Sequence, residues 1–139
     1  MINLPNKDQF IRYFSRCYNW EDKYLYIIEL GEKLLQFPKE MRTPHNLITG
    51  CQNQVWISLS IKTDNKIQLY GDSEAAIVKG LIAITFIIYQ GLTAEDIISY
   101  DAISFFSALS FTQHLTPSRS HGLKAMIQHI RSQATTFFQ

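Results

Sequence analysis

Residues 75–89, AAIVKGLIAITFIIY, form the most apolar stretch of the chain and constrain its fold more than any other segment. As a helix, this stretch would carry apolar side chains on nearly every side, so other elements would have to cover it. It is interrupted by Lys79 and is shorter than the roughly 20 residues that a transmembrane helix needs. We therefore predict a central helix over about 74–90, covered by a sheet and by other helices.

The remaining elements follow from caps, breakers and periodicity. Asn6, with Gln9 three residues later, and Asn19 are typical N-cap positions. The prolines, glycine and polar residues of 38–50 indicate a loop. The expected elements are a helix from Asn6 to about Cys17, a helix from Asn19 to before Pro38, strands over 54–61 and 66–70 joined by a hairpin turn at 63–65, the central helix capped by Asp72 or Ser73 and ended by Gly91, short helices around 94–99 and 104–110, and a final helix from about Pro117 with Leu123, Met126, Ile127 and Ile130 on its core face.

These elements predict an α+β fold with a small antiparallel sheet packed with helices, and a single domain over residues 1–139. Thirteen basic and twelve acidic residues leave a net charge of +1. This balance argues against a nucleic-acid or anionic-membrane surface. The N-terminus has no basic segment followed by an apolar one, so we expect a cytoplasmic protein with reduced thiols.

Cys51 stands where a loop pattern changes into a strand pattern, in LITGCQNQVWISL (47–59). From Val55 to Ile61 apolar and polar residues alternate, which is typical of a half-buried strand. Gly50 lacks a Cβ, so the chain can turn or approach another group closely just before the cysteine. The position raises the question whether Cys51 fills a gap in the core or is presented for chemistry.

Both interpretations of Cys51 are open on the residues alone. Free cysteines commonly behave as small hydrophobic side chains. The glycine before Cys51 and the glutamine after it favour instead a loop thiol toward which backbone N–H groups can point. An ordinary cysteine pKa of about 8.5 leaves only a few per cent of thiolate at neutral pH. A nucleophilic Cys51 would therefore need local activation or a partner protein that completes the site.

The available residues disfavour a metal site and a self-contained hydrolase. The chain has two cysteines and four histidines, whereas a structural zinc site takes about four ligands, usually in close pairs. His45 and Cys51 are the nearest combination, and a thiolate-held iron–sulfur cluster would lack ligands in the same way. A hydrolase would need His45 or His114 as a base for Cys51. His121 and His129 are expected to be solvent-exposed on the last helix.

Cys17 is interpreted differently. It follows Phe14 by three positions on the apolar face of the first expected helix, so we predict a structural thiol. A disulfide between Cys17 and Cys51 is possible in principle, but a reducing compartment disfavours it as a permanent bond.

Four further segments form a pattern over nearly the whole chain: NWEDKYLYIIELG (19–31), GCQNQVW (50–56), GDSEAAIVKGLIA (71–83) and QHLTPSRSHGL (113–123). In this order and separation they resemble SufE, the family of sulfur-acceptor proteins of bacterial iron–sulfur cluster assembly. Asn53 departs from the family pattern, which often has serine there, and so does His121, where glutamine is common. Neither is the cysteine position, so the departures bear on partner contacts and not on the chemistry.

The resemblance implies a fold shared with IscU-type scaffold proteins, and it implies a function. Cys51 would accept sulfane sulfur from the cysteine desulfurase SufS as a persulfide, stimulate cysteine desulfuration and pass the sulfur on, with the SufBCD scaffold complex as recipient. The desulfurase carries the pyridoxal phosphate, so no cofactor and no metal is expected in this chain. Such transfer resembles thiol–disulfide exchange, for which one cysteine suffices. The protein would thus activate an enzyme and would not be a stand-alone enzyme.

Gly50, Gln52 and Arg119 are expected beside Cys51 at the partner interface. By residue type alone, Arg119 would cap or solvate the last helix, and the resemblance adds an acidic group of the desulfurase as its partner. A pocket beneath the loop, formed with Leu47, Ile48 and apolar side chains of the first strand and the 74–90 helix, is expected to shelter Cys51 in the free protein. The protein could form a homodimer. An alternative function is that of a scaffold or binding module in which the cysteine has no role.

Overall fold

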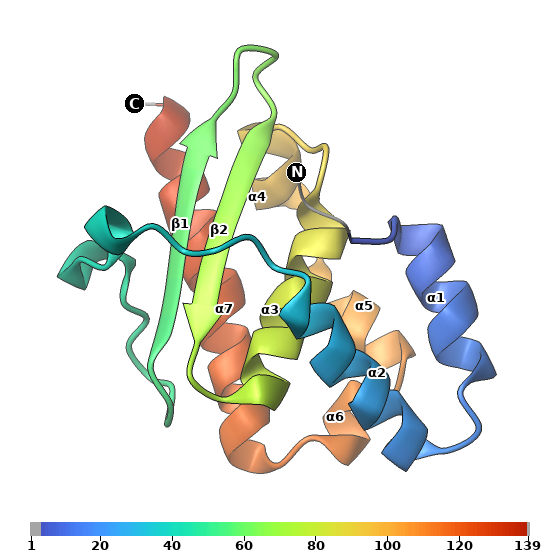
Figure 1. Ribbon diagram of the computed structural model, residues 1–139. Coiled ribbons are helices and arrows are strands. Elements are labelled where there is room, and N and C mark those ends of the chain that lie inside the picture. The colour runs from blue at the N-terminus through green and yellow to red at the C-terminus, as the bar shows by residue number, and fades with distance from the viewer. Residues whose placement is uncertain (1–3, 139) are drawn as a thin grey trace.

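The computed structural model describes residues 4–138 of the 139-residue chain. Its helices and strands, in chain order, are α1 (Lys7–Arg16), α2 (Trp20–Glu32), β1 (Val55–Ile61), β2 (Ile67–Ser73), α3 (Ala76–Tyr89), α4 (Ala94–Ser99), α5 (Ala102–Ala108), α6 (Phe111–His114) and α7 (Pro117–Thr135). Three short 3-10 helices are η1 (Lys39–Met41), η2 (Pro44–Asn46) and η3 (Thr136–Phe138). The two strands form an antiparallel sheet among helices (Figure 1), so the predicted α+β class is confirmed.

Helix α3 is the centre of the fold, as its apolar sequence predicts. Every residue from Gly80 to Tyr89 is buried. Helix α2 packs along α3, and β2 and α7 also contact it (Figure 1). The hydroxyl of Thr85, a polar group inside this core, donates to the carbonyl of Leu81 at 2.8 Å, so its burial leaves no unpaired donor. Gly91 follows the helix with a φ of 78°, the left-handed conformation predicted for its C′ position.

The sheet is longer than the alternating pattern predicts. Strand β1 pairs with β2 from Val55 opposite Ser73 to Ile61 opposite Ile67. The hairpin turn contains Asn65 at a φ of 66°, a conformation that asparagine tolerates. Strand β2 continues past the predicted end at residue 70 because Gly71 stays in the ladder. A Cβ at Gly71 would meet the side chains of α3 at 2.7 Å, so this glycine lets the central helix lie close on the sheet.

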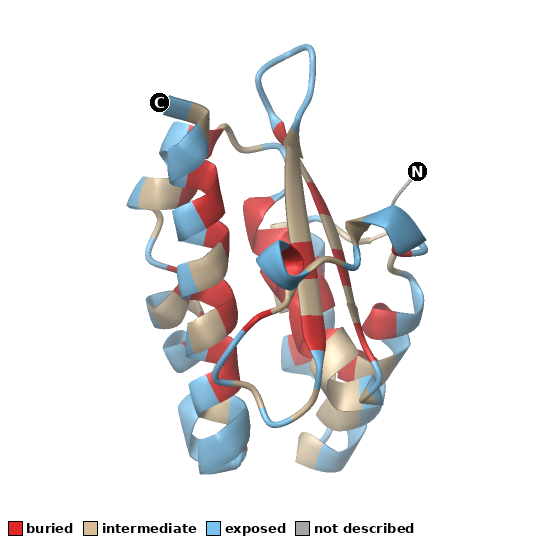
Figure 2. Cartoon of the chain, turned by 90° about the vertical axis from the view of Figure 1, so that its left-hand side faces the viewer, coloured by how far each residue is buried: buried red, intermediate tan, exposed pale blue. Residues whose placement is uncertain are grey.

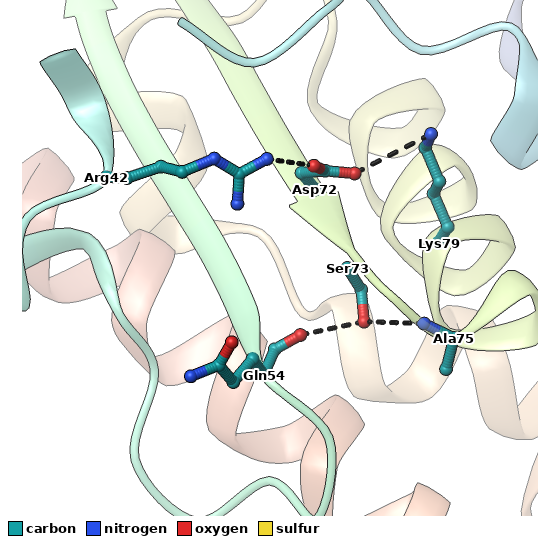
Figure 3. A network of polar contacts seen from close by, with 6 residues as sticks. All are labelled: Arg42, Gln54, Asp72, Ser73, Ala75 and Lys79. Atoms are coloured by element: carbon teal, nitrogen blue, oxygen red, sulfur yellow. Dashed lines mark hydrogen bonds and ion pairs between the residues drawn. The ribbon is translucent and has the colours of Figure 1, made fainter. Parts of the chain in front are cut away.

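The prediction that Asp72 or Ser73 caps α3 is wrong, because both residues lie in β2. The N-cap of α3 is Ala75, which makes no side-chain capping bond. The Asp72 carboxylate forms ion pairs with Arg42 and, at 3.6 Å, with Lys79 (Figure 3). Asp72 thereby ties the long loop before β1 to the sheet and to the start of α3.

Ser73 joins the two strand ends to the start of α3. Its hydroxyl donates to the carbonyl of Gln54 at 2.8 Å and accepts from the N–H of Ala75 at 3.3 Å (Figure 3). Gln54 is the residue that precedes β1. By holding the Gln54 carbonyl, Ser73 therefore fixes the backbone directly before β1, three residues after Cys51.

Helix α7 covers β1 and supplies partners for its outer edge. The predicted core face, Leu123, Met126, Ile127 and Ile130, is buried, and the buried stripe of α7 faces the sheet in Figure 2. The N–H of Leu59 donates to Gln133 Oε1 at 3.1 Å. A two-stranded sheet would otherwise leave such groups of an edge strand unpaired.

His129 is half-buried in this contact, so the prediction that it is solvent-exposed is wrong. Its Nε2 lies 2.9 Å from Gln133 Nε2 and 3.3 Å from the carbonyl oxygen of Ile57. Burial lowers the pKa of His129, because an apolar environment disfavours the charged imidazolium. His121, two turns earlier on α7, is exposed as predicted.

The short helices are partly predicted. Helix α4 has the predicted bounds. Helix α5 begins two residues before the predicted 104–110, because Asp101 is its N-cap and accepts from the N–H of Ser104 at 3.1 Å. Helix α6 has no counterpart among the sequence predictions. In the part of the chain that the structure describes, no helix is both long and apolar enough to cross a membrane.

Candidate functional site

Residues 49–54, which we call the Cys51 loop, form a closed loop before β1. The backbone N–H of Ile48 donates to the carbonyl of Val55 at 2.9 Å, and Leu47 forms a β-bridge with Trp56. Ile48 and Val55 are buried, so the base of the loop is anchored in the core. Gly50 has a φ of 90°, which a residue with a Cβ rarely adopts. The loop thus projects Cys51 from a rigid base.

The thiol of Cys51 rests against the second turn of α7. Its Sγ–H donates to the carbonyl of Gly122, with the sulfur 3.7 Å from the oxygen. A Cβ on Gly122 would stand 3.4 Å from the sulfur, at van der Waals contact, so the thiol lies directly against this turn of α7. Cys51 is partly buried, and burial raises the pKa of its thiol. The resting site therefore favours the protonated, less reactive form.

A cavity of about 210 Å³ opens beside the thiol. Its apolar floor comes from β1, α3 and α7, and its polar rim from the Cys51 loop and the start of α7. The lining residues are Cys51, Gln52, Asn53, Val55, Val78, Leu81, Thr116, Ser118, Arg119, Gly122, Leu123 and Met126. The expected pocket beneath the loop is present. Leu47 and Ile48 do not line it, because they form the base of the loop instead.

The three residues expected at a partner interface gather around this cavity or next to it. Gln52 is exposed and accepts a hydrogen bond from the Ser118 hydroxyl at 2.9 Å. Arg119 is exposed and lines the cavity, while its backbone N–H donates to Thr116 Oγ1 at 3.2 Å in the N-cap of α7. Gly50 is exposed, and a Cβ there would meet His121 Nε2 at 3.5 Å.

Sequence reasoning missed Ser118 and Gly122 as site residues. Both lie in the segment QHLTPSRSHGL, from which only Arg119 is expected at the site. The signal was available, because residues four apart share one face of a helix. The sequence does not show that this face of α7 lies against the Cys51 loop, which precedes it by 66 to 71 residues.

The histidines do not form a catalytic pair with Cys51. Within residues 4–138, the hydrogen-bond partner of the Cys51 thiol is the Gly122 carbonyl, and no histidine nitrogen bonds to the sulfur. The ring of His114 stacks on Trp20 at 4.0 Å, and its Nδ1 lies 3.0 Å from the Ser110 carbonyl oxygen. His45 is exposed in η2. Within the described residues, no histidine is therefore hydrogen-bonded to the thiol as a hydrolytic Cys–His pair would be.

The same described residues contain no group of three or more Cys, His, Asp and Glu side chains placed to hold a metal ion. Both cysteines are free thiols. The reactive group at the cavity is the partly buried thiol of Cys51.

Cys17 lies at the C-cap of α1, one residue beyond the helix. Its Sγ donates to the carbonyl of Tyr13 at 3.6 Å, and its side chain packs against the hydrophobic core. Burial raises its pKa, an effect that the nearby Lys23 opposes. It does not line the cavity beside Cys51, so the two thiols occupy separate surroundings.

Replacing Cys17 by alanine is expected to lower the free energy of unfolding by about 1 kcal/mol, because a partly buried sulfur loses its packing contacts. Urea denaturation measures this cost. Any sulfur loading of Cys51 is expected to survive the replacement. A folded Cys17→Ala protein that can no longer be loaded would contradict the structural role and would indicate a relay of two thiols.

The fold and the site together define a small α+β protein that presents one partly sheltered thiol at the tip of a closed loop. The chain belongs to the SufE family: the family model "SufE: Fe-S metabolism associated domain" matches residues 8–134, nearly the whole chain. The SufE domain associates the protein with Fe–S metabolism. The predicted family membership is confirmed.

Among solved structures, the solution structure of a hypothetical protein from Thermus thermophilus has the same fold. It superposes with a TM-score of 0.76 at 18% sequence identity, and the match covers 93% of each chain. At 18% identity this similarity supports the fold only. Any inference about function rests on the site and on the family.

Proposed function

We propose that the protein is a sulfur carrier that takes sulfane sulfur from a cysteine desulfurase as a Cys51 persulfide. It thereby stimulates cysteine desulfuration and passes the sulfur on for iron–sulfur cluster assembly. The observation that carries the proposal is the thiol at the tip of the Cys51 loop, beside an apolar-floored cavity of about 210 Å³, in a chain of the SufE family.

The proposed step is an exchange at sulfur. The Cys51 thiolate attacks the outer sulfur of a desulfurase persulfide, R–S–SH. A new S–S bond gives Cys51–S–SH while the bond to R–S breaks and R–S⁻ leaves with the electron pair. The step needs no external oxidant or reductant, because the sulfane sulfur keeps its oxidation state. It needs the thiolate, whereas the resting site raises the thiol pKa through burial.

This conflict between reactivity and burial favours two positions of the loop. In the closed position the thiol is protonated and shielded, and a bound persulfide is kept from reductants and oxidants in bulk solvent. In the open position the Cys51 loop reaches into the active site of the desulfurase, where the thiolate can form. Gly50, at a φ of 90°, gives the loop a hinge on its N-terminal side.

The proposed partners follow from this chemistry. The donor is a cysteine desulfurase of the SufS type, and the recipient is a SufBCD-type scaffold complex. Arg119 is exposed, and no carboxylate within residues 4–138 pairs with it, so its guanidinium is available to an acidic group of the desulfurase. Gly50 and Gln52 would contact the partner as the loop enters its site. We place this thiol chemistry in the cytoplasm, where thiols stay reduced.

Mass spectrometry tests the proposal directly. The protein is incubated with desulfurase and cysteine, alkylated and digested without reductant. We expect one added sulfur atom on the peptide that contains Cys51 and none on the peptide that contains Cys17. A Cys51 peptide that stays unmodified, while the desulfurase carries its own persulfide, would contradict the proposal and would favour a binding module with an incidental cysteine.

The closed position predicts slow alkylation of Cys51 in the free protein. We expect iodoacetamide to modify Cys51 at least about tenfold more slowly than in the urea-unfolded chain, which corresponds to about 1.4 kcal/mol. Because burial raises the thiol pKa, the folded rate should also reach its half-maximum at a higher pH than the unfolded rate. Binding to a desulfurase that lacks its active-site cysteine should accelerate the reaction. Equal rates for the folded and unfolded chains would show that the thiol is not sheltered.

A further inference from the structure

We infer that Ser118 and Gly122, on the first two turns of α7, are positioning residues that hold the Cys51 loop closed. The consequence of this closure, the retention of sulfur on Cys51, rests on the proposed function. Ser118 donates to Gln52 at 2.9 Å, and the Gly122 carbonyl accepts from the Cys51 thiol at 3.7 Å. These are the hydrogen bonds between the loop tip and α7 within the described residues. The pair of contacts forms a latch.

The base of the loop separates a fixed part from a part that can move. The Ile48–Val55 backbone bond of 2.9 Å holds both ends of the loop together, and the Ser73 hydroxyl holds the carbonyl of Gln54 at 2.8 Å. The tip packs the Cys51 side chain against the core, but the side-chain hydrogen bonds of Cys51 and Gln52 go to α7 and not to the sheet. Gln52 is exposed, and Cys51 is partly buried against α7. Opening of the tip therefore breaks the two latch contacts and leaves the sheet intact.

Gly122 faces the Cys51 thiol directly. A glycine inside a helix costs about 1 kcal/mol of stability relative to alanine, and Gly122 lies well inside the 19-residue α7. A Cβ at this position would meet only Cys51, at 3.4 Å from Sγ and 4.0 Å from its Cβ. The neighbouring cavity extends the same space. The thiol therefore lies directly against this turn of α7, with the cavity beside it.

Loading with sulfur weakens one half of the latch. The Cys51 thiol has a hydrogen on Sγ and donates it to Gly122. In Cys51–S–SH the Sγ atom has no hydrogen, so Sγ itself can no longer donate to the Gly122 carbonyl. The Ser118–Gln52 hydrogen bond does not involve the sulfur, so loading leaves both of its partners in place. Ser118 therefore matters most for the loaded protein, where shielding is needed.

The test compares four versions of the intact protein. In Ser118→Ala, which removes the latch hydroxyl, we expect Cys51 to react with iodoacetamide severalfold faster than in the wild type. Ser118→Thr keeps the hydroxyl and should restore the slow rate. Ser120→Ala is the matched control, because Ser120 lies on the same helix and does not line the cavity; its rate should equal the wild-type rate. Circular dichroism and thermal melts establish that each variant is folded.

A second variant and a second readout separate a latch from a general structural role. Gln52→Leu removes the other partner of the bond, and combining it with Ser118→Ala should give no further acceleration, because the two side chains act as one unit. Loaded Ser118→Ala should lose its sulfur to dithiothreitol faster than loaded wild type. A merely structural role would change the melting temperature without this non-additive effect on the thiol.

The outcomes distinguish the latch from the proposed function. If Ser118→Ala reacts as slowly as the wild type while the wild type is loaded by the desulfurase, the latch is wrong and the sulfur-carrier function stands. If the wild type is never loaded, the function is wrong, and the alkylation rates still decide whether the latch exists. An equal acceleration in Ser120→Ala would also overturn the assignment to Ser118.

Discussion

Replacing Cys51 by serine is expected to abolish sulfur loading and the stimulation of the desulfurase, while the protein stays folded. Serine is nearly isosteric with cysteine, and its hydroxyl can donate to the Gly122 carbonyl in place of the thiol. An alcohol, however, is not a nucleophile at neutral pH without an adjacent base, and no histidine nitrogen within residues 4–138 bonds to this position. The loss should therefore concern chemistry and not stability.

Mass spectrometry after reaction with desulfurase and cysteine measures the loading, and urea denaturation measures the stability. The Cys51→Ser protein retains Cys17 as its one cysteine, so it also shows whether Cys17 takes up sulfur by itself. Cys17→Ala is the matched control with the other thiol removed. Sulfur carried by Cys51→Ser, or undiminished stimulation of the desulfurase by that variant, would contradict the role of Cys51.

The fold was predictable where a local pattern allows one structure. The continuous apolar stretch requires a covered helix, and α3 is buried from Gly80 to Tyr89. Asn6 is the predicted N-cap of α1, and it forms a capping box with Gln9. Asp72 misled the prediction because aspartate before a helix is a common cap, whereas here Arg42, thirty residues earlier, pairs with it. A polar residue such as Asp72 can cap a helix or form an ion pair. The choice depends on residues far away in the sequence, which a local pattern does not reveal.

The candidate site divides in the same way. The change from a loop pattern to alternation locates Cys51 at the entry to β1, and the chemistry proposed for it comes from a resemblance over four segments. Ser118, Gly122 and the burial of His129 depend instead on how α7 lies across the Cys51 loop and β1. Such contacts join residues about seventy positions apart. They follow from packing of the whole core, which periodicity alone does not specify.

Replacing Gly80 by alanine is expected to destabilise the protein by about 3 kcal/mol or more, because there is no room for a methyl group. A Cβ at Gly80 would stand 2.2 Å from the carbonyl oxygen of Ile27 and 2.5 Å from its side chain. Gly31 faces the same contact from α2, and a Cβ there would stand 2.7 Å from the backbone nitrogen of Gly80. The two glycines let α2 and α3 touch backbone to backbone, so α2 would have to move away from the core.

Helix propensity predicts the opposite sign, since alanine in a helix interior is favoured over glycine by about 1 kcal/mol. The measured change in urea denaturation therefore decides between local preference and packing. Gly91→Ala is the matched control: Gly91 has a φ of 78° and nothing within 4 Å of the added Cβ, so it should lose only about 1 kcal/mol from backbone strain. A Gly80→Ala protein as stable as Gly91→Ala would mean that α2 and α3 do not meet at these glycines. Because α3 also lines the cavity beside Cys51, a displaced α2 that disturbs α3 should accelerate alkylation of the thiol as well.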